Sequence, residues 1–322
     1  MCTLKLIKEV NQKETLTIEL AKVPAIIKEW QPEEVIKASL KKEMKINFNR
    51  MNDASFGDTF FDYHYVENSE PIDYRHLLLK LSDGKEIMTG IRFFGLDKTK
   101  AYVELVYTNF FEFDLETLKE IAQVIKKRYR VFNPFAFRLL HSGDLVKQFQ
   151  SLNIKKDLHF YTGKKSSIMQ MEVPIKYEQI ELRKPNDLDF YSLYMGTLDF
   201  YIEDNPGSEE YVFTLEKEEL EKLNTMGSLF CTYIDEQWAG IIACDYLQMK
   251  YLEGYCIVEE CLIDKFRGKH FAAAIQRKMV EMLPGDMHTL VYGEIHDRNI
   301  PSRKTASKNG RITTGTNYFI YL

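Results

Sequence analysis

Residues 251–310 constrain the fold more than any other part of the sequence, because strand and helix signals alternate there in a fixed order. The run 254–263 is largely apolar and β-branched, which is typical of a strand covered on both faces. A helix is predicted over 271–283, where good helix formers carry apolar residues at helical spacing. Residues 289–296 predict another strand, and a second helix is expected to open at Asn299. This order places a tight turn between a buried strand and a helix.

The turn has the sequence Arg267-Gly268-Lys269-His270-Phe271-Ala272. It starts the helix without a side chain that could cap the first backbone N–H groups, so these groups point outward with the positive end of the helix dipole. A helix N-terminus of this kind favours an anion. The sequence therefore predicts a phosphate-binding turn.

This turn resembles the Arg/Gln-x-x-Gly-x-Gly/Ala turn by which the GCN5-related N-acetyltransferase (GNAT) superfamily cradles the pyrophosphate of coenzyme A. Residues 299–310 resemble the Asn-x-x-Ser/Ala…Gly helix of the same superfamily. The order of the two motifs, their spacing and the strand between them match the superfamily pattern. The resemblance covers roughly the last 145 residues, a common domain size. The resemblance implies a coenzyme-A-dependent N-acyltransferase, with acetyl-CoA or another acyl-CoA as co-substrate.

The resemblance also implies a set of cofactor-binding residues. They are the turn itself, the backbone just before it at Cys261, Leu262 and Ile263, and Asn299 and Ser302 on the later helix, which would contact the pantetheine arm or order the helix cap. Two positions depart from the pattern. His270 replaces the middle glycine, so the backbone can approach a phosphate safely only if this residue keeps a negative φ. Ala306 replaces the tyrosine that often protonates the leaving thiolate.

Acyl transfer to an amine requires a base that takes the amine proton and a donor that polarises the thioester carbonyl. Glu259 and Glu260 interrupt the apolar pattern of the strand before the turn, and either is a candidate base. Their side chains should point to opposite faces of the sheet, so at most one readily faces a cleft. The alternative is that one is solvated and the other is paired with a cation. Tyr292 and Tyr255 are candidate acids by position, and a backbone amide near Cys261 or Leu262 is the oxyanion donor that the resemblance implies.

The segment 187–223 corresponds to the acceptor region of the superfamily. It combines several tyrosines with acidic residues, which indicates an aromatic, acidic pocket for a cationic or amphipathic group. An amphipathic helix with half-buried tyrosines is an equally good interpretation. The chain carries 27 Lys and Arg against 23 Asp and Glu in residues 1–165, but 16 against 25 in the remainder. The acidic second half argues against a nucleic-acid surface and favours a cationic substrate such as an amine. A solvated acidic surface is an equally good interpretation.

Composition sets the outer limits. The 322 residues, 45% apolar and 28% charged, can bury a large core and suffice for two domains. The N-terminus lacks the apolar core of a signal peptide, and no apolar run approaches the ~20 residues that span a bilayer, so a cytoplasmic protein with no membrane partner is expected. The five cysteines show no metal-like pairing, so reduced thiols and no metal site are expected.

The first half repeats the element order of the second. A hairpin is predicted over 76–94, a third strand over 101–107 and a helix that begins near Asp114; shorter elements follow up to residue 161. Residues 108–114 replace the phosphate turn with acidic and aromatic groups. We therefore predict an α/β protein of two tandem GNAT-like domains, each a mixed, mostly antiparallel sheet flanked by helices: a degenerate domain at 1–165 and an acetyltransferase domain at 166–322.

Three functions follow from these observations. The first is an acyl-CoA-dependent N-acyltransferase acting on the amine of a small molecule or peptide. The second is a noncatalytic acyl-CoA-binding regulatory protein. The third is an aminoacyl-tRNA-dependent peptide transferase, supported only by a basic stripe formed by residues 126–130 and Arg138. A nucleic-acid partner is not expected, and a homodimer stays open.

Overall fold

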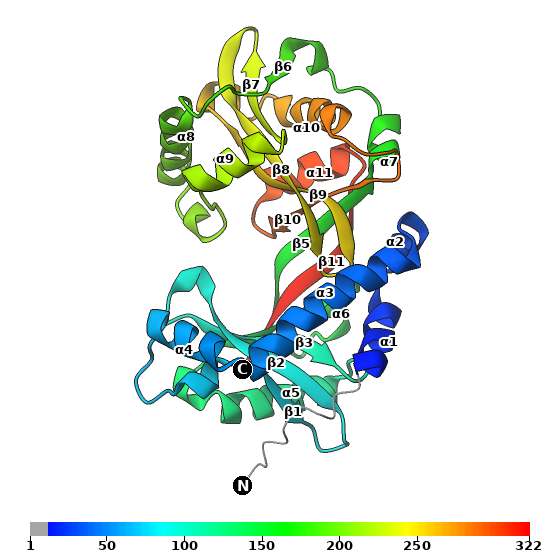
Figure 1. Cartoon of the computed structure of the whole chain (residues 1–322), viewed down its shortest axis with the longest axis vertical. Coiled ribbons are helices and arrows are strands. Elements are labelled where there is room, and N and C mark those ends of the chain that lie inside the picture. The colour runs from blue at the N-terminus through cyan, green and yellow to red at the C-terminus, as the bar shows by residue number, and fades with distance from the viewer. Residues whose placement is uncertain (1–11) are drawn as a thin grey trace. The chain divides into compact units, whose positions relative to one another are not determined.

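The computed structural model describes residues 12–322 and divides into two compact units. Unit 1 contains the described chain up to Asp157 together with Met249–Tyr251 and Gly315–Leu322, and unit 2 contains Leu158–Gln248 and Leu252–Thr314. Both units combine strands with helices (Figure 1). Cys2, expected to be a free thiol, lies outside the described residues.

Unit 1 begins with four helices and continues with alternating strands and helices. Its longer elements are α1 (Gln12–Lys22), α2 (Ala25–Trp30), α3 (Glu33–Asn52), α4 (Ala54–Tyr63), β1 (Leu77–Lys80), β2 (Glu86–Phe93), β3 (Ala101–Thr108), α5 (Leu115–Arg128), β4 (Ala136–His141) and α6 (Leu145–Gln148). The sheet follows the order β1-β2-β3-β4, and the last part of β11 (Ile312–Tyr321) pairs with β4. The hairpin and the third strand predicted from the sequence are confirmed.

Helix α5 shows why the sequence folds in this way. The Asp114 side chain accepts a 2.7 Å hydrogen bond from the Thr117 backbone N–H and so caps the helix at its predicted start. Leu118, Ile121 and Ile125 form the buried stripe, and they pack in one core with Ile87 of β2. The next residue of β2, Met88, packs in a separate cluster with residues of α3. The alternation along β2 therefore fills cores on both faces of the sheet.

Unit 2 carries the elements that follow the first half. They are β5 (Ile154–Lys164), α7 (Lys165–Gln170), β6 (Ile180–Arg183), α8 (Tyr191–Asp204), α9 (Lys217–Thr225), β7 (Leu229–Ile234), β8 (Gln237–Met249), β9 (Leu252–Leu262), α10 (Phe271–Met282), β10 (Leu290–His296) and α11 (Ile300–Lys308). The order of the strands is β5-β10-β9-β8-β7-β6. Strand β10 pairs in parallel with β9 and antiparallel with β5. The sheet is thus mixed and mostly antiparallel, as predicted.

Two core layers cover the two faces of the unit 2 sheet. Phe230 on β7 packs in the layer that contains the buried side of α10. Its neighbours Leu229 and Cys231 point the other way, into the layer that contains residues of α8 and α9. Figure 1 shows α10 and the α8–α9 pair on opposite sides of these strands. The predicted fold class, an α/β protein with helices on both faces of a mixed sheet, is confirmed.

The two units do not follow the halves of the sequence strictly. Strand β5 closes the first half, yet residues 158–164 pair with β10 of unit 2. Strand β11 closes the second half, yet residues 316–321 pair with β4 of unit 1. The predicted limits, 1–165 and 166–322, therefore differ from the units because the two closing strands are exchanged. Among residues 12–322, no helix is both long and apolar enough to cross a membrane.

Candidate functional site

The predicted phosphate turn lies where the sequence places it, between β9 and α10. A short 3-10 turn, Asp264–Phe266, leads into it, and His270 occupies the N-cap position of α10 without any side-chain cap. Gly268 has φ 70° and His270 has φ 67°. The condition set for close phosphate approach, a negative φ at His270, is therefore not met. His270 takes the left-handed conformation that glycine adopts most easily, and histidine is one of the residues enriched there.

Arg267 contributes to the shape of the turn. Its Nε donates to the Leu262 carbonyl at 2.6 Å, its Nη2 donates to the Thr197 carbonyl at 2.9 Å, and its guanidinium lies 4.8 Å from the ring centre of Tyr201. These contacts tie the turn to α8 on one side of the sheet. The guanidinium therefore acts mainly as a brace for the backbone.

The open space at the turn fits an anionic group. A Cβ placed on Gly268 would meet no atom within 4 Å, and the His270 side chain is exposed. The first amides of α10 have no side-chain cap. An uncapped N-terminus with a cleared approach is the local geometry that binds phosphate. The turn therefore has an open, uncapped helix start, and its contact with the pyrophosphate of coenzyme A stays a prediction.

Glu259 is buried beside α8, one of the helices of the acceptor segment. Its Oε2 accepts a 2.6 Å hydrogen bond from the Tyr194 hydroxyl, which in turn accepts one from the Leu215 backbone N–H at 2.9 Å. Burial raises the pKa of Glu259 to about 7, although the Tyr194 hydrogen bond acts in the opposite direction. Glu259 therefore exchanges its proton near neutral pH.

Glu260 faces the opposite layer, on the side of α10. Its Oε2 accepts a 2.5 Å hydrogen bond from the side-chain amide nitrogen of Gln276. The side-chain oxygen of Gln276 accepts hydrogen bonds from Arg311 at 2.5 Å and from Asn309 at 3.1 Å. Burial raises the pKa of Glu260 to about 7, opposed by Gln276 and Arg311. Its other oxygen is buried and has no hydrogen-bond partner within residues 12–322. The two glutamates thus point to opposite faces, as predicted.

Tyr292 lies in the core. Its side chain is fully buried, its hydroxyl donates to the Leu247 carbonyl at 3.3 Å, and burial raises its pKa above the usual range. Tyr255, the other candidate acid, packs edge-on against Tyr246. Ala306, where the superfamily often has a tyrosine, is fully buried on α11. The catalytic assignments of Glu259, Glu260 and Tyr292 stay predictions.

Some of the other predicted cofactor residues already make contacts that stabilise the fold. The Ile263 N–H donates to the Ala239 carbonyl at 2.8 Å, and burial raises the pKa of the Cys261 thiol well above its usual range. The Asn299 side chain caps α11 by accepting from the Ser302 N–H at 3.2 Å. The capping interpretation of Asn299 therefore holds, and its contact with pantetheine stays a prediction.

Sequence reasoning misses the partners of the two glutamates. Tyr194 is one of several tyrosines in the acceptor segment, and nothing in its spacing distinguishes it. Gln276 and Arg311 lie on different elements, so only the fold brings them to Glu260. Four cysteines, at 231, 244, 256 and 261, are free and buried, and residues 12–322 contain no group of metal-binding side chains.

The basic stripe expected in the first half includes Arg138. The structure does not place this residue at the surface. Its guanidinium is largely buried and donates to Glu104 and Asp157, each at 2.8 Å. A buried arginine with two carboxylate partners is part of the fold and is not available to RNA. The RNA-dependent interpretation therefore retains only the exposed positive charges at the end of α5.

Comparison with known proteins finds likeness at the level of structure. No family model and no curated protein matches the chain. Solved structures similar to it include a GNAT-family acetyltransferase from Colwellia psychrerythraea (11% identity, 83% of this chain and 95% of that one, TM-score 0.48) and a GCN5-related N-acetyltransferase from Sphaerobacter thermophilus (11%, 84% and 85%, 0.49). A third is a GCN5-related N-acetyltransferase from Kribbella flavida (9%, 83% and 95%, 0.42).

Other similar structures, from Staphylococcus epidermidis and Bacteroides thetaiotaomicron, are of proteins of unknown function. In fold, the chain is an α/β protein with a mixed, mostly antiparallel sheet flanked by helices. Likenesses at this identity concern the fold alone and transfer no substrate or residue role to this chain.

Proposed function

We propose that the chain is an acyl-CoA-dependent N-acyltransferase, with acetyl-CoA as the expected donor and the amine of a small molecule or peptide as the acceptor. One observation carries the proposal. The uncapped N-terminus of α10, opened by Gly268, directly follows the strand that bears a carboxyl group with a pKa of about 7. An anion site and a proton acceptor thus sit within one strand–turn–helix unit.

The chain supplies the binding groups. The amides from Gly268 to Ala272 would hold the pyrophosphate of coenzyme A, helped by the positive end of the α10 dipole. Lys269 is exposed in the same turn and adds a positive charge. The donor itself would supply the acyl group as a thioester.

Glu259 is the better candidate for the base. An amine attacks only after it loses a proton, and a carboxylate with a pKa near the working pH accepts that proton efficiently. Glu259 lies on the face of the acceptor helices and is oriented by Tyr194. Glu260, in contrast, is held with Gln276 and Arg311 in a buried network on the other face. The proton of the amine would therefore pass to a Glu259 oxygen, directly or through water.

No side chain is assigned as the acid. The Tyr292 hydroxyl is held by the Leu247 carbonyl in a buried site, and Ala306 offers no proton. A departing thiolate can take its proton from water. The same two residues favour a second candidate function, a noncatalytic acyl-CoA-binding protein, because they leave the site without a positioned proton donor.

Calorimetric titration with acetyl-CoA, free CoA and desulfo-CoA tests the binding step. G268E should abolish binding, because it places a carboxylate where the pyrophosphate would lie. The control is G84E in the β1–β2 turn, since Gly84 also has a positive φ, 84°, and a Cβ placed on it would likewise meet no atom within 4 Å. G84E should bind like the unmodified chain.

A thiol-release assay with a panel of amines then separates the two functions. Thiol release that depends on an amine supports the transferase. Tight binding with no release by any amine supports the noncatalytic alternative. No binding of any CoA species to the unmodified chain would overturn both proposals.

A further inference from the structure

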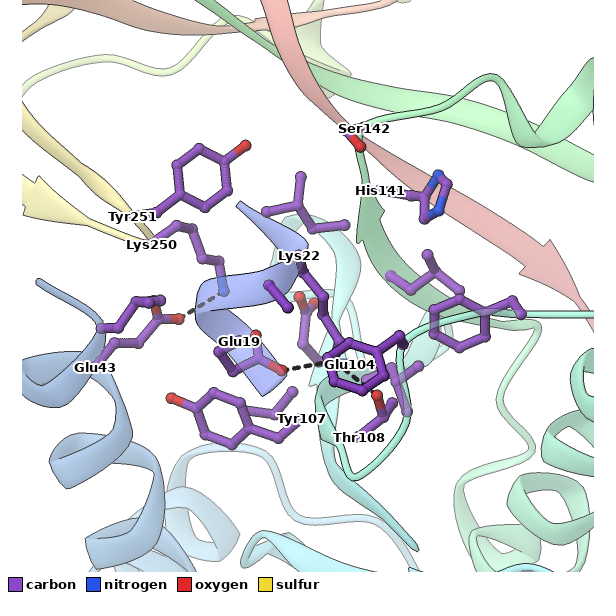
Figure 2. A pocket seen from close by; sticks show the side chains of 18 residues that line it. Glu19, Lys22, Glu43, Glu104, Tyr107, Thr108, His141, Ser142, Lys250 and Tyr251 are labelled. Carbon is purple, nitrogen blue, oxygen red and sulfur yellow. Dashed lines mark hydrogen bonds and ion pairs between the residues drawn. The ribbon is translucent and has the colours of Figure 1, made fainter. Parts of the chain in front are cut away.

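Unit 1 contains a cavity of about 270 Å³ between two strands that stop pairing. Strands β3 and β4 pair in parallel only over Tyr102–Glu104 of β3. The cavity lies beyond this pairing and is lined by residues 105–108 of β3 and 139–142 of β4. Helices α1 and α3 and residues 250 and 251, which also belong to unit 1, complete the wall (Figure 2). Its volume is below the ~300–1,000 Å³ of drug-sized sites, so it suits a small molecule.

The parting of the two strands leaves backbone groups at this space. One edge of β3 pairs with β2, and one edge of β4 pairs with β11. Strand geometry directs the N–H and C=O groups of the other two edges toward each other. Beyond Glu104, no strand of residues 12–322 pairs with these edges. They therefore suit a ligand that both donates and accepts hydrogen bonds.

The charged groups of the wall form pairs within the protein. The pairs are Glu19 with Lys22 at 2.6 Å, Glu43 with Lys250 at 2.6 Å and Glu104 with Arg138 at 2.8 Å, and Figure 2 draws the first two. Burial lowers the pKa of His141, so its ring is neutral as well. The lysines would repel a cation, and the glutamates would repel an anion. An uncharged ligand is therefore favoured.

Lys250 is the side chain best placed to hold such a ligand. It has φ 55° in the β8–β9 turn, a left-handed conformation that is uncommon for a residue other than glycine and that is often found at functional sites. Its side chain lines the cavity and uses one N–H group for Glu43. No other hydrogen bond joins this ammonium to a residue within 12–322. Its remaining N–H groups can therefore donate to a carbonyl oxygen.

The rest of the wall is apolar. Phe111 and Phe113 come from the loop after β3, and Leu139 and Leu140 come from β4. Phe111 is 53% exposed, so a ligand that covers it removes apolar surface from water. Such a wall suits the hydrocarbon part of a ligand.

We propose that this cavity is a binding site for a small uncharged secondary amide that carries an apolar group. Its carbonyl oxygen accepts from Lys250, its N–H donates to the strand edges where β3 and β4 part, and its hydrocarbon part lies against the phenylalanine and leucine side chains. This inference does not rest on the proposed transferase function, because it concerns binding to unit 1 in the absence of coenzyme A.

The test is a titration of the full chain, without coenzyme A, by N-butylacetamide at pH 8, followed by calorimetry and by thermal unfolding. Butyl acetate, n-heptylammonium and hexanoate have the same number of non-hydrogen atoms; the first lacks the N–H group, and the other two are charged. The amide should bind saturably and raise the unfolding temperature, butyl acetate should bind several-fold more weakly, and the two ions should not bind. Non-saturable behaviour of the amide, or equally tight binding of any of the other three, would overturn the proposal.

Two variants locate the site. K250M replaces the ammonium by an apolar group of similar length and should weaken binding of the amide about tenfold. It should also strengthen binding of n-heptylammonium, because Glu43 loses its cation. K28M, at an exposed lysine of α2, is the matched control and should bind as the unmodified chain does.

F111A tests the apolar wall independently, because Phe111 is half exposed and its truncation leaves the core intact. It should weaken binding of the amide several-fold. Unchanged binding of the amide in folded K250M, or in F111A if K250M does not fold, would contradict the site.

Discussion

The Tyr194 hydroxyl donates a 2.6 Å hydrogen bond to Glu259, and this contact links α8 to the end of β9. The same hydroxyl accepts from the Leu215 N–H, so it also fixes the loop before α9. Tyr194 is fully buried and cannot exchange this partner for water. A single phenol therefore positions the candidate base relative to the acceptor segment.

The first prediction concerns pH and Glu259. Because burial raises its pKa to about 7, the base is protonated at pH 6 and ionised at pH 8. The rate of acyl transfer, measured as kcat/KM by thiol release, should therefore rise with pH through an inflection near 7. E259Q should lower kcat by about 10²–10⁴-fold and remove this inflection, while acetyl-CoA binding is retained. A full rate in E259Q would exclude Glu259 as the base.

The second prediction concerns Tyr194 as a positioning residue. Its hydrogen bond stabilises the ionised Glu259 and so lowers the pKa of that carboxyl. Y194F should move the inflection of the pH–rate profile upward by about one pH unit. The control is Y191F, which removes the hydroxyl of a neighbouring ring on the same helix and should leave the inflection in place. If Y194F lowered the rate at every pH but left the inflection in place, Tyr194 would have a purely structural role.

The third prediction concerns stability and Glu260. Burial raises its pKa in the folded chain to about 7, so the folded state binds more protons than the unfolded state between about pH 4.5 and 7. The free energy of unfolding should therefore fall as pH rises through this window. E260Q should be as stable as the unmodified chain near pH 4.5 and more stable at pH 8, by about 1–3 kcal/mol. Urea unfolding at both pH values checks this, and a difference that does not vary with pH would refute the linkage.

The fourth prediction concerns the left-handed residue of the turn. His270 has φ 67°, a conformation that costs a side-chain-bearing residue about 1–2 kcal/mol. H270G should raise the free energy of unfolding by about 0.5–1 kcal/mol, after allowance for the greater freedom of glycine in the unfolded chain. H288G, at an exposed histidine that is not among the positive-φ residues, should lower it instead. Destabilisation by both changes would mean that His270 makes contacts that offset its strain.

The elements and their order could be predicted from the sequence because their signals are local. The cap at Asp114, the stripe that contains Leu118 and Ile121, and the cap at Asn299 can be read within one or two helical turns. The opposite orientation of Glu259 and Glu260 likewise follows from the two-residue period of a strand.

Features that depend on distant residues could not be predicted in this way. The conformation of His270 depends on how α10 meets the preceding 3-10 turn, which no single residue type encodes. The burial of Arg138 depends on Glu104 and Asp157, both far along the chain. The partners of the two glutamates come from α8, α10 and the start of β11, so their identities required the fold.

The exchange of β5 and β11 makes the chain a domain swap within a single polypeptide. A fragment that ends at residue 165 lacks β11, the antiparallel partner of β4, and one that begins at residue 166 lacks β5, the antiparallel partner of β10. Each fragment would expose an open strand edge, which is prone to aggregate. Attempts to express one half alone should therefore yield insoluble protein, whereas co-expressed halves could complement each other. A cut near residue 165 therefore removes a strand from both units at once.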